Sequence, residues 1–189
     1  MKKLITFICL AGLAAGCSQS PNPTPSVSQS SSPADRTFAS SSTPLPLPAY
    51  DPAQKGRIKP GESVDGLKIG VNGPEMEKIL GKPDTADRLL KTQIFACYYA
   101  KGIEVALVGN KVETITCHVA EKTPDGEWKA YTGATTDGLW VGSQREDFEK
   151  SLGTGGRSFK EAIQYPSKGL WIRFDESGKT NTVSVRKIE

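Results

Sequence analysis

Hydrophobic and polar residues alternate with a helical period in the stretch that follows Asn72. Met76, Ile79 and Leu80 recur at the spacing i, i+3, i+4 and form one apolar stripe. Asn72 ahead of them is a good N-cap, and Gly81 after them ends the helix. The pattern predicts a helix of about three turns, which is too short to be stable alone in water and must pack against another element.

A second stretch carries the same pattern, with Ser143 as the expected N-cap, Phe148 and Leu152 on the apolar side and Gly153 at the end. When the sequence is shifted by 72 residues, nine of the 21 positions from Gly61 to Gly81 are identical. Chance would give only one or two, so we interpret the chain as an internal repeat.

Runs rich in β-branched and aromatic residues follow each expected helix and predict strands. They cover residues 90–99, 103–108 and 111–119 in the first half, and 159–165, 170–174 and 180–188 in the second. Gly102 and Gly169 mark matching turns. The predicted fold is α+β: two tandem copies, residues 57–122 and 129–189, each a short helical element packed on a three-stranded antiparallel sheet.

The N-terminus has the pattern of an export signal. Lys2 and Lys3 precede an apolar run of twelve residues, 4–15. Since a spanning helix needs about 20 apolar residues, the run predicts a signal peptide, residues 1–16, that is removed. The sequence Leu-Ala-Ala-Gly before Cys17 resembles a bacterial lipobox, in which the cysteine thiol receives a diacylglycerol. An ordinary signal peptide with an incidental cysteine is the alternative.

Lipidation at Cys17 would anchor the chain to a membrane of the cell envelope. In a bacterium with two membranes, Ser18 after the cysteine resembles the signal for the outer membrane, facing the periplasm. In a bacterium with one membrane, the same anchor would lie on the outer face of the plasma membrane.

The segment after Cys17 has the composition of a tether. Residues 18–49 contain 10 Ser and 7 Pro among 32 positions, so they have little to bury and are expected to stay disordered. We therefore assign residues 17–56 to a lipidated, disordered tether. The run Pro-Leu-Pro-Leu-Pro, residues 44–48, favours a polyproline-like form. It is either part of an inert tether or a docking peptide.

Net charge argues against a nucleic-acid partner. The whole chain has a formal charge of +3, from 24 basic and 21 acidic residues. Removal of residues 1–16 takes away Lys2 and Lys3 and no acidic residue, which leaves +1. A nucleic-acid-binding protein would need a basic patch or stripe, and none is evident.

Two cysteines, Cys97 and Cys117, remain besides Cys17 once the signal is removed. An exported protein often forms disulfides. However, the first and third strands of a meander lie about 9.6 Å apart, while disulfide-linked Cα atoms lie within about 7 Å. We expect buried free thiols, with a disulfide as the alternative.

Catalytic and metal-binding patterns are missing from the sequence. The only histidine, His118, follows Cys117 on a predicted strand, where adjacent side chains point to opposite faces and cannot form a nucleophile–base pair. One histidine and two separated cysteines do not make a metal site. The glycine-rich run 153–156 follows a helix, whereas a phosphate loop precedes one. We expect no enzyme activity, no metal and no cofactor.

Comparison of the two halves singles out two tryptophans. Trp140 aligns with Lys68 and Trp171 aligns with Glu104, and charged residues at these positions indicate a solvent-facing surface. Arg173 lies two residues beyond Trp171 on the same strand face. Trp and Arg are enriched in binding hot spots, so Trp140, Trp171 and Arg173 are candidate partner-binding residues. Alternatively, the tryptophans fill the interface between the two copies.

The first helix and its flanks resemble a known signature. Gly70-Val71-Asn72 through Leu80-Gly81-Lys82-Pro83 is similar to the helix-then-sheet module of the BamE/SmpA outer-membrane lipoproteins. Two such modules in tandem resemble the β-lactamase inhibitor protein family. The resemblance implies a mostly non-catalytic role: assembly accessory, enzyme inhibitor or envelope module.

These observations together predict a membrane-anchored bacterial lipoprotein that acts as a non-catalytic protein–protein interaction module of the cell envelope. Its expected partner is another envelope protein. The alternative is a non-catalytic module that binds a cell-wall glycan or peptide, because aromatic side chains also stack on sugars.

Overall fold

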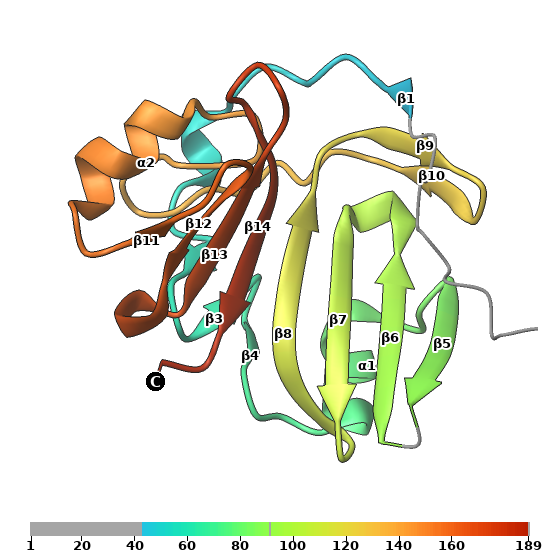
Figure 1. The fold of residues 1–189 in the computed structure, drawn as a ribbon. Coiled ribbons are helices and arrows are strands. Elements are labelled where there is room, and N and C mark those ends of the chain that lie inside the picture. Colours follow the sequence, from blue (N-terminus) through green and yellow to red (C-terminus); the bar gives the residue numbers. More distant parts are fainter. Residues whose placement is uncertain (1–42, 91, 189) are drawn as a thin grey trace, which may run out of the picture. The chain divides into compact units, whose positions relative to one another are not determined.

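The computed structural model describes residues 43–90 and 92–188 (Figure 1). The expected signal peptide, residues 1–16, the lipidation site Cys17 and the first part of the tether therefore lie outside the described residues. The structure of the later part of the tether, from residue 43 onward, is given below.

Eight strands form one antiparallel sheet that runs across both halves of the chain (Figure 1). The strands from the first half are β5 (Thr85–Leu90), β6 (Gln93–Tyr98), β7 (Ile103–Val108) and β8 (Lys111–His118). Those from the second half are β11 (Arg157–Ser158), β12 (Ala162–Tyr165), β13 (Leu170–Phe174) and β14 (Thr180–Arg186). Their order is β11-β12-β13-β14-β8-β7-β6-β5.

The predicted fold class, two tandem copies that each pack a short helical element on a three-stranded antiparallel sheet, is wrong. Strand β14 pairs directly with β8, so the strands of both halves belong to one sheet. The edge groups of an unpaired β8 or β14 would expose unmet hydrogen-bond donors and acceptors, and units of about 60 residues bury too little to be stable alone. Pairing these two edges removes both liabilities.

The first helix follows its sequence signals closely. Helix α1 spans Gly73–Leu80, and the Asn72 side chain accepts a hydrogen bond from the Glu75 backbone N–H at 3.0 Å. Gly81 ends the helix at φ 84°, where a residue with a side chain would be strained. Met76 and Leu80 are buried, whereas Ile79, which belongs to the predicted apolar stripe, is 42% exposed.

The second helix begins one residue later than the sequence predicted. Helix α2 spans Arg145–Leu152 and its N-cap is Gln144, not Ser143. The Asp147 carboxylate accepts a hydrogen bond from the Gln144 backbone N–H, which is half of a capping box. Ser143 is buried instead, and its hydroxyl oxygen accepts a hydrogen bond from the Trp140 backbone N–H at 3.0 Å.

Two small sheets complete the described residues. One has the order β2-β3-β4, from Ile58–Lys59, Ser63–Val64 and Leu67–Lys68. The other has the order β1-β9-β10, from Thr43–Pro44, Glu121–Thr123 and Gly126–Trp128. The sequence predicted neither sheet, and β9 and β10 extend over residues 123–128, which lie between the two predicted copies.

The segment before α1 packs against the second half of the chain. The Ile58 backbone N–H donates to the Ala134 carbonyl at 3.0 Å. A Cβ atom on Gly169 would lie 2.5 Å from the Cα atom of Gly61, so two backbones meet there with no room for a side chain. These contacts also show that the halves share their packing.

The main core lies on one face of the eight-stranded sheet. Its buried residues come from both helices, from the β2-β3-β4 sheet and from alternate positions of β6, β7, β8, β12, β13 and β14. We call this the inner face. Phe148 of α2, for example, meets Phe174 of β13 edge-on, with ring centroids 6.2 Å apart. Because successive strand residues point to opposite sides, the remaining positions form the outer face.

Both cysteines are buried and free, as the meander geometry predicts. Strand β7 lies between β6, which carries Cys97, and β8, which carries Cys117. Cys97 is opposite Glu104, whereas Cys117 is opposite Ile103, the next residue along β7, so the two thiols are on opposite faces. No disulfide can form between them in this fold.

Candidate functional site

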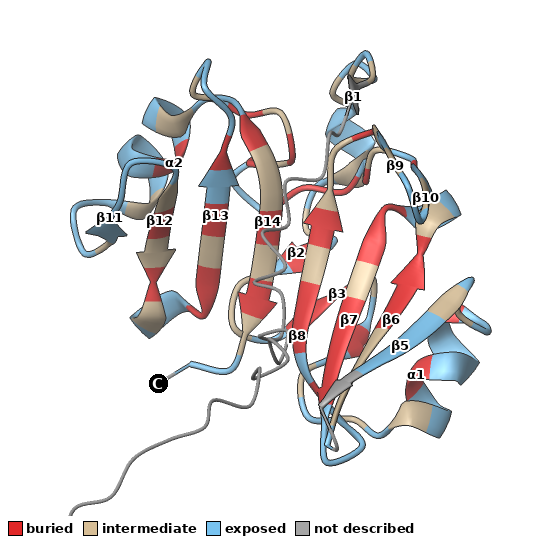
Figure 2. Cartoon of the chain, turned by 45° about the vertical axis from the view of Figure 1, so that its right-hand side comes forward, coloured by how far each residue is buried: buried red, intermediate tan, exposed pale blue. Residues whose placement is uncertain are grey.

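The outer face carries a continuous row of polar and aromatic residues across six strands. The register places Gln164 opposite Trp171, Trp171 opposite Ser184, and Ser184 opposite Thr116. It continues from Thr116 to Glu104 and from Glu104 to Cys97. Figure 2 shows the alternation between buried and more exposed residues along β12 and β13. The candidate site is built on this row and on the neighbouring residues of the outer face.

One end of the outer face is covered by the hairpin of β9 and β10. Trp128, only 5% exposed, stacks on His118 with ring centroids 4.2 Å apart and an interplanar angle of 17°. Tyr99 meets the other side of this cluster edge-on, 4.7 Å from Trp128. Burial lowers the pKa of His118 to about 4, so its imidazole is neutral at pH 7. We call this group the covered end.

The other end of the outer face is partly open and cationic. The Arg186 guanidinium lies over the Trp171 ring, 3.6 Å from its centroid, in a cation–π contact. Trp171 is half-buried, and Arg173, on the same face of β13, is exposed. We call Trp171, Arg173 and Arg186 the open end. The sequence analysis named the first two residues as candidates and did not name Arg186.

A signal for Arg186 is present in the sequence. The polar residues Thr182, Ser184 and Arg186 alternate with Val183 and Val185, which puts all three polar residues on one face of a strand. What the sequence does not supply is the strand pairing, which brings Arg186 beside Trp171. The covered end was missed for a similar reason, because nothing local shows that the hairpin folds back over His118.

Trp140 lies apart from the eight-stranded sheet, in the segment between residues 139 and 142. Its ring is 5.7 Å from the ring of Tyr50, and it packs against the edge of the main core. The junction of the two halves is made by other residues: Thr116 and Ser184 share a hydrogen bond at 3.0 Å, and Cys117 is opposite Val183. Neither tryptophan belongs to that β14–β8 pairing.

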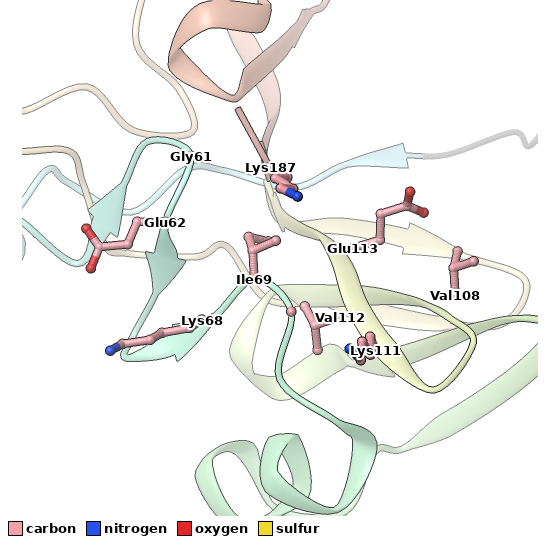
Figure 3. A pocket seen from close by; sticks show the side chains of 10 residues that line it. Gly61, Glu62, Lys68, Ile69, Val108, Lys111, Val112, Glu113 and Lys187 are labelled. Carbon is pink, nitrogen blue, oxygen red and sulfur yellow. The ribbon is translucent and has the colours of Figure 1, made fainter. Parts of the chain in front are cut away.

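A pocket beside the sheet has charged lining residues that do not converge on one point. It measures about 560 Å³ and lies between the β2-β3-β4 sheet and the β7–β8 turn. Figure 3 shows its charged side chains spread around the apolar residues Ile69 and Val112. They carry both signs, with acidic Glu62 and Glu113 and basic Lys68, Lys111 and Lys187.

Residues 43–90 and 92–188 contain neither a cluster of metal ligands nor a helix that could span a membrane. No group of three or more potential metal ligands occurs in that part of the chain. None of its helices is long and apolar enough to cross a membrane.

No family model matches the chain, and no curated protein does. Solved structures that are similar to it include the following two. An extracellular protein with an SCP domain from Bacillus anthracis is 15% identical, with a TM-score of 0.45; the match covers 63% of this chain and 44% of that one. A cysteine-rich secretory protein from Staphylococcus aureus is 14% identical, with a TM-score of 0.44, covering 70% of this chain and 47% of that one.

The chain thus spans less than half the length of each matched structure. The predicted relation to the BamE/SmpA lipoproteins and the β-lactamase inhibitor protein family is wrong, because the strands of both halves form one eight-stranded sheet and not two helix-on-sheet modules. The signature that suggested the relation consists of residues such as Asn72 and Gly81, which cap and end a helix. Such residues recur wherever a short helix must start and stop.

Proposed function

We propose that this chain is a lipid-anchored, non-catalytic module of the bacterial cell envelope that binds another envelope protein through the open end of its outer face. The observation that carries the proposal is the contact between Trp171 and Arg186, with the exposed Arg173 beside it. A large aromatic ring with arginines around it is typical of residues that dominate binding energy.

The charge of the open end suggests the chemistry of the partner. Arg173 and Arg186 contribute two positive charges beside Trp171. A partner that presents a carboxylate there would gain charge-assisted hydrogen bonds to the exposed Arg173 guanidinium. We therefore expect an acidic patch on the partner protein, with an apolar residue that contacts the Trp171 ring.

A cell-wall glycan is the second candidate, and one contact disfavours it. A sugar that stacks on tryptophan needs a free face of the ring. One face of Trp171 already holds the Arg186 guanidinium at 3.6 Å, which a sugar using that face would have to displace. A protein partner can leave this cation–π contact in place and pack against the edge of the Trp171 ring.

Enzyme activity is the third candidate function. Its natural general base would be His118, which is packed under Trp128 and has a pKa lowered by burial to about 4. Such a histidine is a poor base near neutral pH because the ideal catalytic pKa lies near the operating pH.

Crosslinking in intact cells followed by pull-down tests the proposal. The full chain would be compared with a Trp171→Ala/Arg173→Ala variant and with Phe159→Ala, which removes an aromatic residue that is 51% exposed but belongs to neither end of the outer face. We expect a specific protein band with the wild type and Phe159→Ala, and its loss with the double variant.

A band that persists in the folded double variant would contradict the proposal. Circular dichroism would establish that each variant is folded. The anchor is tested separately with Cys17→Ser, which should move the protein from the membrane fraction to the soluble fraction without altering the outer face.

A further inference from the structure

Residues 45–50, which we call the strap, lie along the folded domain although their composition placed them in the tether. Ahead of the strap, β1 pairs with β9. The Leu45 backbone N–H then donates to the Ala120 carbonyl at 3.1 Å. The tether therefore joins the domain first as an added strand and then as an extended segment.

The sequence of the strap alternates in step with its contacts. Leu45 and Leu47 are half-buried, whereas Pro46 and Pro48 are exposed. Proline lacks a backbone N–H, so it suits the positions that turn away from the domain. It also holds the chain extended and so reduces the entropy lost when the strap docks.

Leu47 and Tyr50 lie against a surface built around Trp140. A Cβ atom on Gly142 would lie 2.9 Å from Cδ1 of Leu47, so the glycine leaves room for that side chain. The ring of Tyr50 lies 5.7 Å from the ring of Trp140, tilted by 38°. This surface, made by Ala120, Trp140 and Gly142, is called the strap groove.

The strap is held loosely. None of its six residues is fully buried, whereas Ile58, a few residues later, is 0% exposed. Pockets of about 660 Å³ and about 550 Å³ lie beside it, and Leu45 and Leu47 line both. Segments with so few buried contacts open locally at a much lower free energy than the whole domain unfolds.

We propose that the strap groove is a binding site for extended peptides in which leucines alternate with prolines, and that the strap is its resident, displaceable occupant. Release of the strap uncovers Trp140 and adds the strap to the length of the tether. The groove uses different residues from the open end of the outer face, so this proposal does not depend on the proposed function.

Mass action sets how far the resident strap competes with an added peptide. A short flexible connection gives an effective concentration of about 1 mM. If the same peptide binds in trans with a Kd of about 0.1 mM, roughly one molecule in ten has an open groove. An added peptide then binds the wild type about tenfold more weakly than it binds a protein whose own strap cannot dock.

The test uses a fluorescent peptide with the sequence of residues 43–50, Thr-Pro-Leu-Pro-Leu-Pro-Ala-Tyr, and the full chain in three forms. The Leu45→Asp/Leu47→Asp variant cannot dock its strap. Pro46→Asp/Pro48→Asp adds the same charge at the exposed positions and is the matched control. We expect fluorescence anisotropy to show binding to the leucine variant about tenfold tighter than to the wild type or the proline variant.

Hydrogen exchange at the Leu45 amide provides a second measurement. In the wild type this amide should exchange faster than the amides of β8. It should exchange about tenfold more slowly than the amide of residue 45 in the Leu45→Asp/Leu47→Asp variant. Two results would overturn the proposal: no peptide binding to the leucine variant, or a wild-type strap as protected as β8. The first would mean that the groove has no peptide affinity, and the second that the strap is a permanent part of the domain.

Discussion

The two ends of the outer face present the same type of side chain in opposite settings. At the covered end, the buried Trp128 of the β9–β10 hairpin stacks on the half-buried His118 and shields its Nε2 atom from water. At the open end, Trp171 is half-buried and carries the Arg186 guanidinium at 3.6 Å. A histidine can lose its charge when it is buried, whereas arginine stays protonated and keeps contact with water or a partner. We therefore expect the first end to stabilise the fold, and we propose the second as the binding surface.

The largest effect on stability is expected from Trp128→Ala. The change removes a ring that is 5% exposed and leaves a cavity above His118. Replacing a buried tryptophan by alanine costs about 3–5 kcal/mol of the free energy of unfolding. Urea denaturation monitored by circular dichroism measures this loss. A loss below about 1 kcal/mol would mean that the hairpin does not stabilise the covered end.

Acidification should also lower the stability of the folded chain, because it favours protonation of His118 in the unfolded state. His118 has a pKa of about 4 when folded and about 6.5 when unfolded, so below pH 6.5 the unfolded chain binds a proton that the folded chain does not. The contribution of His118 to the free energy of unfolding is fully present above pH 6.5. It falls by about 3 kcal/mol in total as the pH drops towards 4.

A His118→Phe variant is the control for this pH dependence, because phenylalanine retains a ring beneath Trp128 and does not titrate. The difference in unfolding free energy between the wild type and this variant should change between pH 6.5 and 4. If the two proteins lose stability in parallel, carboxylates and not His118 are responsible.

At the open end, Trp171→Ala should cost only about 1 kcal/mol of stability, the scale of one cross-strand pair with a cation–π contact. Its effect on the partner should be much larger, with the crosslinked band lost. A melting curve and the crosslinking assay on the same preparation separate the two effects. An unfolded Trp171→Ala protein would show that the open end is structural as well.

The smallest effect is expected from Phe159→Ala. The ring is 51% exposed, so its removal should change the unfolding free energy by less than about 0.5 kcal/mol and leave partner binding unchanged. A loss of the crosslinked band in this variant would place the contact surface outside the open end.

Local features of the fold could be predicted from sequence, and long-range ones could not. Asn72 and Gly81 mark the start and the end of α1, as predicted, because capping and termination depend only on neighbouring residues. Strand β8 was placed correctly apart from its last residue, yet its pairing with β14 was missed. That pairing joins residues more than sixty positions apart, and alternation within one strand does not reveal which edge it meets.

The candidate site shows the same division. Trp171 and Arg173 share a face because they are two residues apart on one strand, which sequence reveals. Trp140 was grouped with them because both tryptophans align with charged residues, but it lies beside Tyr50 of the strap. Alignment of the two halves could not show this, since the strap belongs to a segment with no counterpart in the repeat.

Site-specific photocrosslinking in intact cells tests the central claim most directly. One probe replaces Gln164, which is opposite Trp171, and the other replaces Glu127, an exposed residue of the hairpin over the covered end. We predict that the probe at residue 164 captures one specific envelope protein, that Trp171→Ala abolishes this capture, and that the probe at residue 127 does not capture it. Equal capture from both positions, or capture from residue 164 that survives Trp171→Ala, would contradict the account.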